Sequence, residues 1–66
     1  MRIYVNGEPT QVDAEIPLAA LIQQLALTDE KIAVEVNQEV VPRSTFGDHR
    51  LQPDDQIEIV RAIGGG

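Results

Sequence analysis

One stretch decides the fold, residues 16–25, which read Ile16-Pro17-Leu18-Ala19-Ala20-Leu21-Ile22-Gln23-Gln24-Leu25. Its apolar residues are spaced i, i+3, i+4 and i+7, so they share one face of an α-helix: Leu18, Leu21, Ile22 and Leu25. Pro17 suits the first helical turn. We predict one helix that ends near residues 26–28 without a glycine cap and covers a sheet, and we prefer this to a helix face that binds a partner helix.

A β-hairpin is predicted before this helix. Residues 1–5 alternate between two faces, with Met1, Ile3 and Val5 on one of them. Asn6-Gly7 follows, a dipeptide typical of two-residue hairpin turns. We place the second strand at residues 8–13, where a proline near the start is tolerated on a sheet edge.

Several shorter elements are predicted after the helix. Residues 32–36 alternate as in a half-buried strand, and Asn37-Gln38 is expected to turn the chain into a short strand over residues 39–41. Residues 43–47 suit a 3₁₀ or irregular segment with Phe46 as an apolar plug, and residues 49–51 suit a brief strand. The last strand is expected from residue 56 to about residue 62 after a Pro-Asp turn. In that strand Ile57 and Ile59 face one side, and Glu58, Val60 and Ala62 face the other.

This order of elements predicts the α+β class, with a mixed four- to five-stranded sheet and one main helix packed on one face. It is the β-grasp (ubiquitin-like) pattern. We assign residues 1–63 to the β-grasp domain and residues 64–66 to a flexible C-terminal glycine tail.

Composition excludes several classes of function. The chain has 66 residues, a formal net charge of −6 and no cysteine. Nucleic acid is not expected as a partner, because phosphate contacts need clustered Lys and Arg. Disulfides and thiolate zinc sites are excluded, and no apolar run approaches the roughly 20 residues of a membrane span. With no secretory signal at the start of the sequence, a cytoplasmic protein is expected.

Few residues suggest catalysis or metal binding. Asp54 and Asp55 are adjacent carboxylates, but such pairs at a turn are usually solvated turn formers. His49 is the sole histidine and is expected at the surface. We therefore predict no catalytic residue, no metal site and no bound cofactor. The final glycines are not a phosphate-binding loop, because that motif also needs Lys and Ser or Thr at a helix start.

The sequence closes on Arg61-Ala62-Ile63-Gly64-Gly65-Gly66, where a strand runs directly into three glycines. Terminal glycines are often only a frayed end. Glycine, however, passes through gaps that no side chain would clear, so such an end can be inserted into another protein's active site. Gly66 then presents an unhindered carboxylate, and Gly64 and Gly65 form the access tail.

The whole chain resembles the ubiquitin-like sulfur carriers, most closely the ThiS family of thiamine biosynthesis. The segment from Ala33 to Arg43 discriminates best, whereas a Gly-Gly end alone also occurs in ubiquitin-like modifiers and molybdopterin-synthase small subunits. The third glycine departs from the pattern, but Gly65-Gly66 match its pair. The resemblance rests on these stretches: Ile3-Tyr4-Val5-Asn6-Gly7, Leu21-Ile22-Gln23-Gln24-Leu25, Ala33-Val34-Glu35-Val36-Asn37-Gln38-Glu39-Val40-Val41-Pro42-Arg43 and Asp54-Asp55-Gln56-Ile57-Glu58-Ile59.

The resemblance implies a carrier that is not an enzyme. An adenylating (ThiF-like) enzyme would use ATP to convert the Gly66 carboxylate into an acyl adenylate. A persulfide sulfur donor would then yield a thiocarboxylate, and thiazole synthase (ThiG-like) would accept the sulfur for the thiazole ring. The absence of cysteine fits, because the sulfur would reside on the Gly66 carbonyl carbon.

A partner-binding surface is predicted near the last strand, on Tyr4, Glu58, Val60, Arg61, Ala62 and Ile63. For Arg61 the alternative is a solvated side chain, and isolated surface apolar residues are ordinary. Three rival functions stay open at this point. They are a carrier for another sulfur pathway such as molybdopterin or amino-acid synthesis, a ubiquitin-like protein modifier, and a plain interaction domain with an inert tail.

Overall fold

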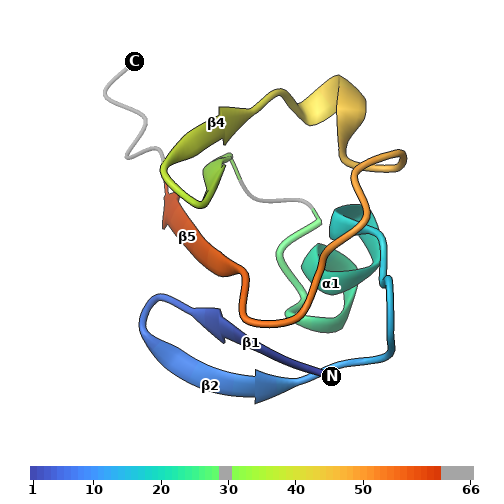
Figure 1. Cartoon of the computed structure of the whole chain (residues 1–66). Helices are drawn as coiled ribbons and strands as arrows, with labels where there is room; N and C mark the ends of the chain where they lie inside the picture. Colours follow the sequence, from blue (N-terminus) through green and yellow to red (C-terminus); the bar gives the residue numbers. More distant parts are fainter. Residues whose placement is uncertain (29–30, 62–66) are drawn as a thin grey trace.

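The computed structural model describes residues 1–28 and 31–61, and Figure 1 shows the arrangement of their helices and strands. In chain order the elements are β1 (Arg2–Val5), β2 (Glu8–Gln11), α1 (Leu18–Gln24), β3 (Ile32–Val36), β4 (Glu39–Val41), a 3₁₀ helix (Arg43–Thr45) and β5 (Gln56–Arg61). The predicted order of hairpin, helix, strands and final strand is therefore confirmed. The expected last residue of that strand, Ala62, lies outside the described residues.

The strands form one mixed five-stranded sheet in the order β2-β1-β5-β3-β4. β1 and β5 pair in parallel, and the other neighbours pair antiparallel. β5 is last in the described chain but central in the sheet, and α1 lies across one face of it (Figure 1). This is the predicted α+β arrangement, with five strands and one main helix.

Both hairpins turn through two residues in the left-handed conformation. Asn6 and Gly7 have φ of 50° and 84°, and Asn37 and Gln38 have φ of 52° and 71°. Positive φ at both central residues is the geometry that matches the twist of the flanking strands. Glycine accepts this geometry without strain, whereas Gln38 adopts it at a cost.

The core lies between α1 and the sheet and is entirely aliphatic apart from Phe46. Alternate residues of the strands and one stripe of the helix point into it, as their periods predict. The predicted role of Phe46 as an apolar plug is confirmed. The buried residues are Ile3, Ile16, Leu18, Leu21, Ile22, Val34, Val36, Val41, Phe46, Leu51 and Ile57.

The C-terminal end of α1 differs from the prediction in two ways: the helix ends before residues 26–28, and Leu25 does not belong to the buried stripe. The helix ends at Gln24, so Leu25 is 37% exposed and does not join the buried set. Ala26 adopts φ of 59°, its N–H donates to the Gln23 carbonyl at 3.0 Å, and the Leu27 N–H donates to the Ile22 carbonyl at 3.1 Å. These two bonds form a Schellman motif, which usually has glycine where this chain has alanine. Leu27 packs against the core in place of Leu25.

Two further predictions need correction. β2 ends at Gln11 and not at Asp13, although Val12 still exchanges hydrogen bonds with Met1. Residues 49–51 form no strand but a single antiparallel β-bridge, between Arg50 and Pro17. Their backbone instead bonds the segment at the start of α1, because the Leu18 N–H donates to the His49 carbonyl at 2.8 Å. The His49 residue is half-buried, less exposed than the surface position that was predicted.

Candidate functional site

The predicted reactive end lies outside the described residues: Ala62, Ile63, Gly64, Gly65 and Gly66. The structure describes the strand that precedes this end. β5 runs to Arg61, five residues before Gly66, and is paired along both of its edges with β1 and β3. The base of the predicted tail is thus the central strand of the sheet.

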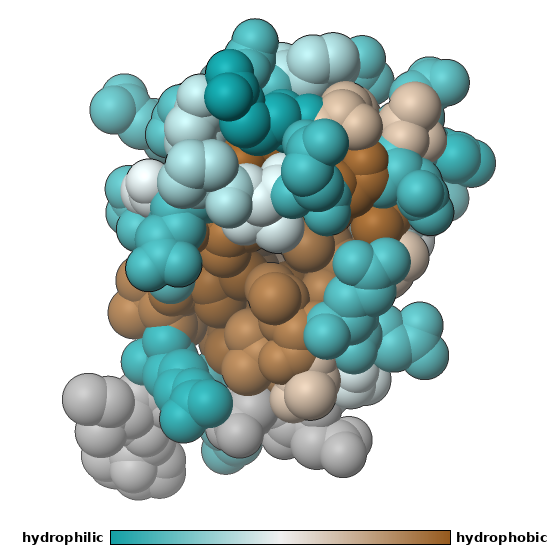
Figure 2. Space-filling view, turned by 90° about the horizontal axis from the view of Figure 1, so that it is seen from below, coloured by the Kyte–Doolittle hydropathy of each residue, from teal (hydrophilic) through white to brown (hydrophobic). Residues whose placement is uncertain are grey.

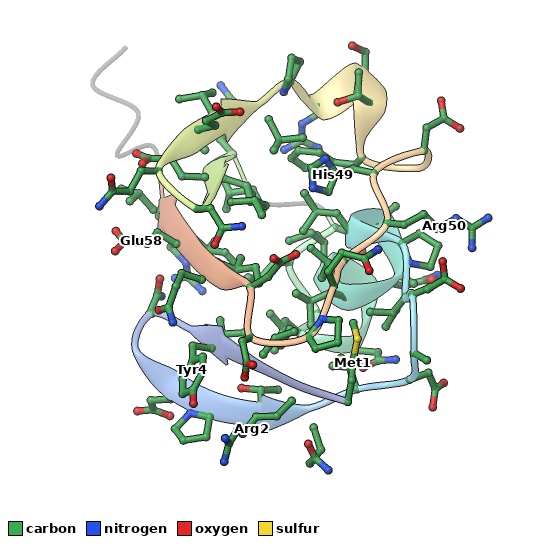
Figure 3. The ribbon with its side chains drawn as sticks, viewed as in Figure 1. Met1, Arg2, Tyr4, His49, Arg50 and Glu58 are labelled. Carbon is green, nitrogen blue, oxygen red and sulfur yellow. The ribbon has the colours of Figure 1, made fainter. Side chains whose placement is uncertain are left out.

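Side chains of β5 alternate between the helix side and the open side of the sheet. Ile57 is buried and Ile59 is half-buried in contact with the core, whereas Glu58 is exposed and Val60 is 58% exposed. The predicted facing of the last strand is confirmed for its described residues. Figure 3 shows Glu58 on β5 and Tyr4 on the neighbouring β1.

Strand register places further residues beside Glu58 and Val60. Glu35 of β3 lies opposite Glu58, and Ala33 lies opposite Val60. Val40 of β4 lies opposite Glu35 and is 71% exposed. Because each pair shares one side of the sheet, these residues form one surface, which we call the outer face: Ala33, Glu35, Val40, Glu58 and Val60.

Sequence reasoning missed Ala33, Glu35 and Val40. Assigning them to this surface needs the strand order, which one sequence does not reveal. Val40 carried a local signal, because it precedes the buried Val41 in a strand and must therefore point to the other side. The outer face combines two exposed valines with two carboxylates, so it fits a partner that has an apolar patch flanked by basic side chains.

Tyr4 lies on the same side of the sheet as Glu58, because its neighbour Ile3 is buried and its partner Gln56 alternates with Ile57, whereas Arg61 does not. Tyr4 is half-buried and pairs with Gln56 at the beginning of β5, and the Arg2 guanidinium lies 5.6 Å from the centre of its ring. Arg61 belongs to the opposite side of the sheet, because it follows the inward alternation of Ile57 and Ile59. Arg61 therefore does not share a side of the sheet with Glu58 and Val60, and its part in partner binding stays a prediction.

Arg61 lines a groove between the end of β5 and the end of α1. The groove is also lined by Val5, Asn6, Leu25, Leu27 and Ile59. Seen from below, the molecule shows a broad apolar area bordered by polar side chains (Figure 2).

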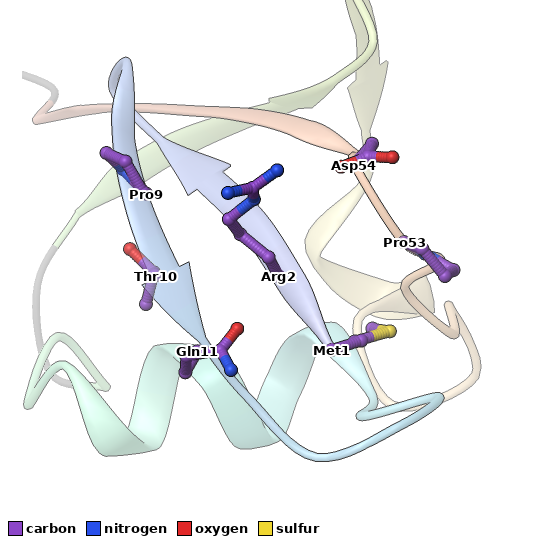
Figure 4. Close-up of a pocket in the computed structure, with 7 residues that line it drawn as sticks. All are labelled: Met1, Arg2, Pro9, Thr10, Gln11, Pro53 and Asp54. Carbon is purple, nitrogen blue, oxygen red and sulfur yellow. The ribbon is translucent and has the colours of Figure 1, made fainter.

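A second depression lies between the β1–β2 hairpin and the turn before β5 (Figure 4). Arg2, Pro9, Pro53 and Asp54 are among its lining residues. This depression adjoins the beginning of β5, whereas the predicted reactive end follows the other end of the strand. We therefore assign it no part in the chemistry of Gly66.

The aspartates serve the turn before β5. One carboxylate oxygen of Asp55 accepts from the Asn37 amide at 3.0 Å, and the other accepts from the Gln52 N–H at 2.8 Å. Asp54 has φ of 67°. In residues 1–28 and 31–61, no three His, Cys, Asp or Glu side chains are grouped to hold a metal ion. Within the same ranges, no helix has the length and apolarity needed to cross a membrane.

The model of the ThiS family matches residues 2–66. The chain belongs to the ThiS family. It is 33% identical over 66 residues to the sulfur carrier protein ThiS of Escherichia coli, and the match covers 100% of both chains. A crystal structure of the thiamine biosynthesis protein ThiS from Geobacter metallireducens superimposes with a TM-score of 0.85, at 33% identity and with 100% of each chain covered.

Another ThiS-like region occurs inside a larger relative. A thiazole synthase of Magnetococcus marinus is 50% identical to this chain over 66 residues, which are 100% of this chain and 20% of that protein. The chain therefore spans about a fifth of the length of that relative. The solved structure supports the β-grasp fold, and the family model and the E. coli relative support membership of the ThiS family.

Proposed function

We propose that this chain is a protein cosubstrate and not an enzyme, and that Gly66 carries sulfur as a thiocarboxylate for the thiazole ring of thiamine. The family match supports this, because it extends through residue 66 and so includes the residue that would react. That match is the observation that carries the proposal. The chain itself would bind no cofactor, since ATP is consumed by the partner enzyme.

The chemistry follows from the weakness of a carboxylate as an electrophile. An adenylating (ThiF-like) enzyme would join the Gly66 carboxylate to the AMP part of ATP, with release of pyrophosphate. A persulfide donor would then attack the carbonyl carbon and displace AMP, and a thiol would cleave the resulting sulfur–sulfur bond to leave a thiocarboxylate. Glycine at this position keeps the carbonyl open to attack. Thiazole synthase (ThiG-like) would receive the sulfur.

The outer face is the proposed docking surface for the adenylating enzyme. Val60 and Val40 offer exposed apolar area on either side of β3, and Glu35 and Glu58 offer negative charge between them. The net charge of −6 would speed encounter with a basic partner surface. The proposed docking surface also includes Ala62 and Ile63, and Gly64 and Gly65 are proposed to form the access tail.

Mass spectrometry tests the proposal. The chain is incubated with its adenylating enzyme, ATP and a persulfide donor, and the expected product gains the mass difference between sulfur and oxygen at its C-terminus. Adding thiazole synthase should return the carboxylate as the thiazole forms. The control is a chain without Gly65 and Gly66, which should gain no mass. A branched conjugate with lysine would instead indicate a protein modifier, and transfer only to another acceptor would indicate another sulfur pathway.

A further inference from the structure

The side chain of Asn6 continues the pairing of β1 with β5 beyond the end of β1. The Asn6 N–H donates to the Ile57 carbonyl at 2.8 Å. Its side-chain oxygen Oδ1 accepts from the Ile59 N–H at 2.8 Å, and its Nδ2 donates to the Ile59 carbonyl at 3.3 Å. Asn6 has turned into the left-handed conformation, so its side-chain amide takes the place that a further peptide group of β1 would occupy.

A second asparagine does the same at the other end of β5. The Asn37 N–H donates to the Gln56 carbonyl at 2.8 Å, and the Gln56 N–H donates to Asn37 Oδ1 at 2.9 Å. Asn37 also stands first in a two-residue left-handed turn. The two asparagines thus hold the two ends of the central strand: Asn6 binds Ile59 through its side-chain amide alone, and Asn37 binds Gln56 through its backbone N–H and its Oδ1.

Of these two contacts, the one made by Asn6 is closer in sequence to the reactive end. Ile59 precedes Gly66 by seven residues, whereas Gln56 precedes it by ten. Beyond Ile59, the strand pairing described for β5 is with β3, through Val60 opposite Ala33 and Arg61 opposite Ile32. Within the described chain, Asn6 therefore supplies the last hydrogen bonds from the β1 side before β5 ends.

We propose that Asn6 is a positioning residue for the reaction at Gly66, an inference that rests on the proposed function. By holding both backbone groups of Ile59, Asn6 fixes the β1 side of β5 two residues before the described end of the strand at Arg61. A docked carrier then presents its carboxylate to the adenylating site in a narrower set of positions, which raises its effective concentration there. Asn6 acts through Ile59 and does not touch the reacting atoms.

The experiment compares Asn6→Gly with Asn37→Gly. Glycine keeps the left-handed turn in both variants and removes the side-chain amide; Asn37→Gly also loses the bond to Asp55, which makes it the more demanding control for stability. Adenylation is followed as pyrophosphate release at increasing carrier concentration, and carrier binding to the enzyme is measured separately without ATP. Because misplacement of a reacting group by about 1 Å can slow a reaction up to roughly a hundredfold, we expect Asn6→Gly to lower kcat about tenfold with unchanged Kd. Asn37→Gly should change neither value.

Hydrogen exchange and a third variant, Asn6→Asp, complete the test. Hydrogen exchange should speed up at the Ile59 amide in Asn6→Gly and at the Gln56 amide in Asn37→Gly. Asn6→Asp keeps an acceptor for the Ile59 N–H and loses the donor to its carbonyl, so its kcat should lie between those of Asn6→Gly and the unaltered chain. Asn6→Asp also takes the place of Asn6→Gly in this experiment if Asn6→Gly does not fold.

The outcomes separate this inference from the proposed function. If the unaltered chain is charged and Asn6→Gly is charged with the same kcat, Asn6 does not position the tail, whereas the carrier function stands. Equal losses of kcat in Asn6→Gly and Asn37→Gly would also overturn the inference. Such losses would reflect a less stable fold and not a positioning role of Asn6. If the unaltered chain gains no sulfur under any of these conditions, it is the proposed function that fails.

Discussion

Glu35 lies directly opposite Glu58 where β3 pairs antiparallel with β5, on the side of the sheet away from the helix. Side chains that face each other in this way are about 5 Å apart at Cβ, and two like charges there destabilise the sheet. Neither carboxylate can turn into the core, which the neighbouring Val34 and Ile57 fill. The pair therefore destabilises the sheet of the free protein, and a cationic side chain that approached both carboxylates would offset their repulsion.

Replacing Glu35 by lysine should stabilise the free protein. Glu35→Lys turns a repulsive cross-strand pair into an attractive one, and we expect the free energy of unfolding to rise by about 0.2–1 kcal/mol. Urea unfolding measures the change. Glu39→Lys is the control, because it alters the net charge equally but lies opposite Val36. Equal effects of the two variants would mean that only net charge matters.

Reversing the charge of Glu58 in the outer face should weaken binding of the adenylating enzyme. We expect Glu58→Lys to raise the Kd for the adenylating enzyme about tenfold, which corresponds to about 1.4 kcal/mol. The effect should shrink at high salt, because exposed charges are screened. Gln23→Lys adds positive charge on the exposed side of α1 and should leave this Kd unchanged. An unaltered Kd in Glu58→Lys would remove the outer face from the docking surface.

The turn between β3 and β4 offers a stabilising substitution. Gln38 is held at φ of 71°, a conformation that costs a residue with a side chain about 1–3 kcal/mol. Gln38→Gly should therefore raise the thermal midpoint by several degrees, since about 1 kcal/mol corresponds to roughly 4–8 °C in a domain of this size.

Gly7→Ala is the converse change in the other hairpin. A Cβ at Gly7 would meet no atom within 4 Å, so any loss of stability measures backbone strain alone. We expect a loss of about 1–2 kcal/mol. A neutral Gly7→Ala together with a neutral Gln38→Gly would show that these turns carry no such strain.

A similar gain is expected at the end of α1. Ala26 occupies the left-handed position of the Schellman motif, where glycine is usual. Ala26→Gly should raise the free energy of unfolding by about 1 kcal/mol, measured by urea unfolding. Ala19→Gly lies within the helix and should instead destabilise it by about 0.5–1 kcal/mol. A loss of stability in both variants would mean that helix propensity outweighs the geometry of the cap.

The final glycine can be tested for steric access. Gly66→Val should fold as the unaltered chain does, because it changes no residue of the core. It should be adenylated much more slowly, since a β-branched side chain crowds the carbonyl. Circular dichroism checks the fold, and pyrophosphate release measures the rate. Charging at the unaltered rate would show that access is not the reason for glycine at this position.

Local patterns were sufficient to predict most elements of this fold. Alternation placed Ile3, Val34 and Ile57 in the core, and the Asn-Gly dipeptide placed the first turn. The end of the helix was harder, because no glycine marks it and Ala26 adopts the left-handed conformation regardless. Residues 49–51 were misassigned because their bonds go to the segment before the helix, a contact that no local pattern reveals.

The candidate site was only partly predictable. Glu58 and Val60 followed from alternation, and the same alternation, which placed Ala62 with them, puts Arg61 on the other side. Glu35 and Val40 depend on which strands are neighbours. The roles of Asn6 and Asn37 beside β5 depend on long-range pairing as well, because each side chain bonds a strand distant in sequence.

The central place of β5 has a consequence for how this chain is made. Until β5 emerges from the ribosome, β1 and β3 lack the strand that joins the two hairpins, so the sheet exists only as separate halves. Contacts between segments so distant in sequence also form late, because closing the long intervening loop costs entropy. A nascent chain interrupted before Ile57 would thus lack the strand that joins its two hairpins and could not form the five-stranded sheet.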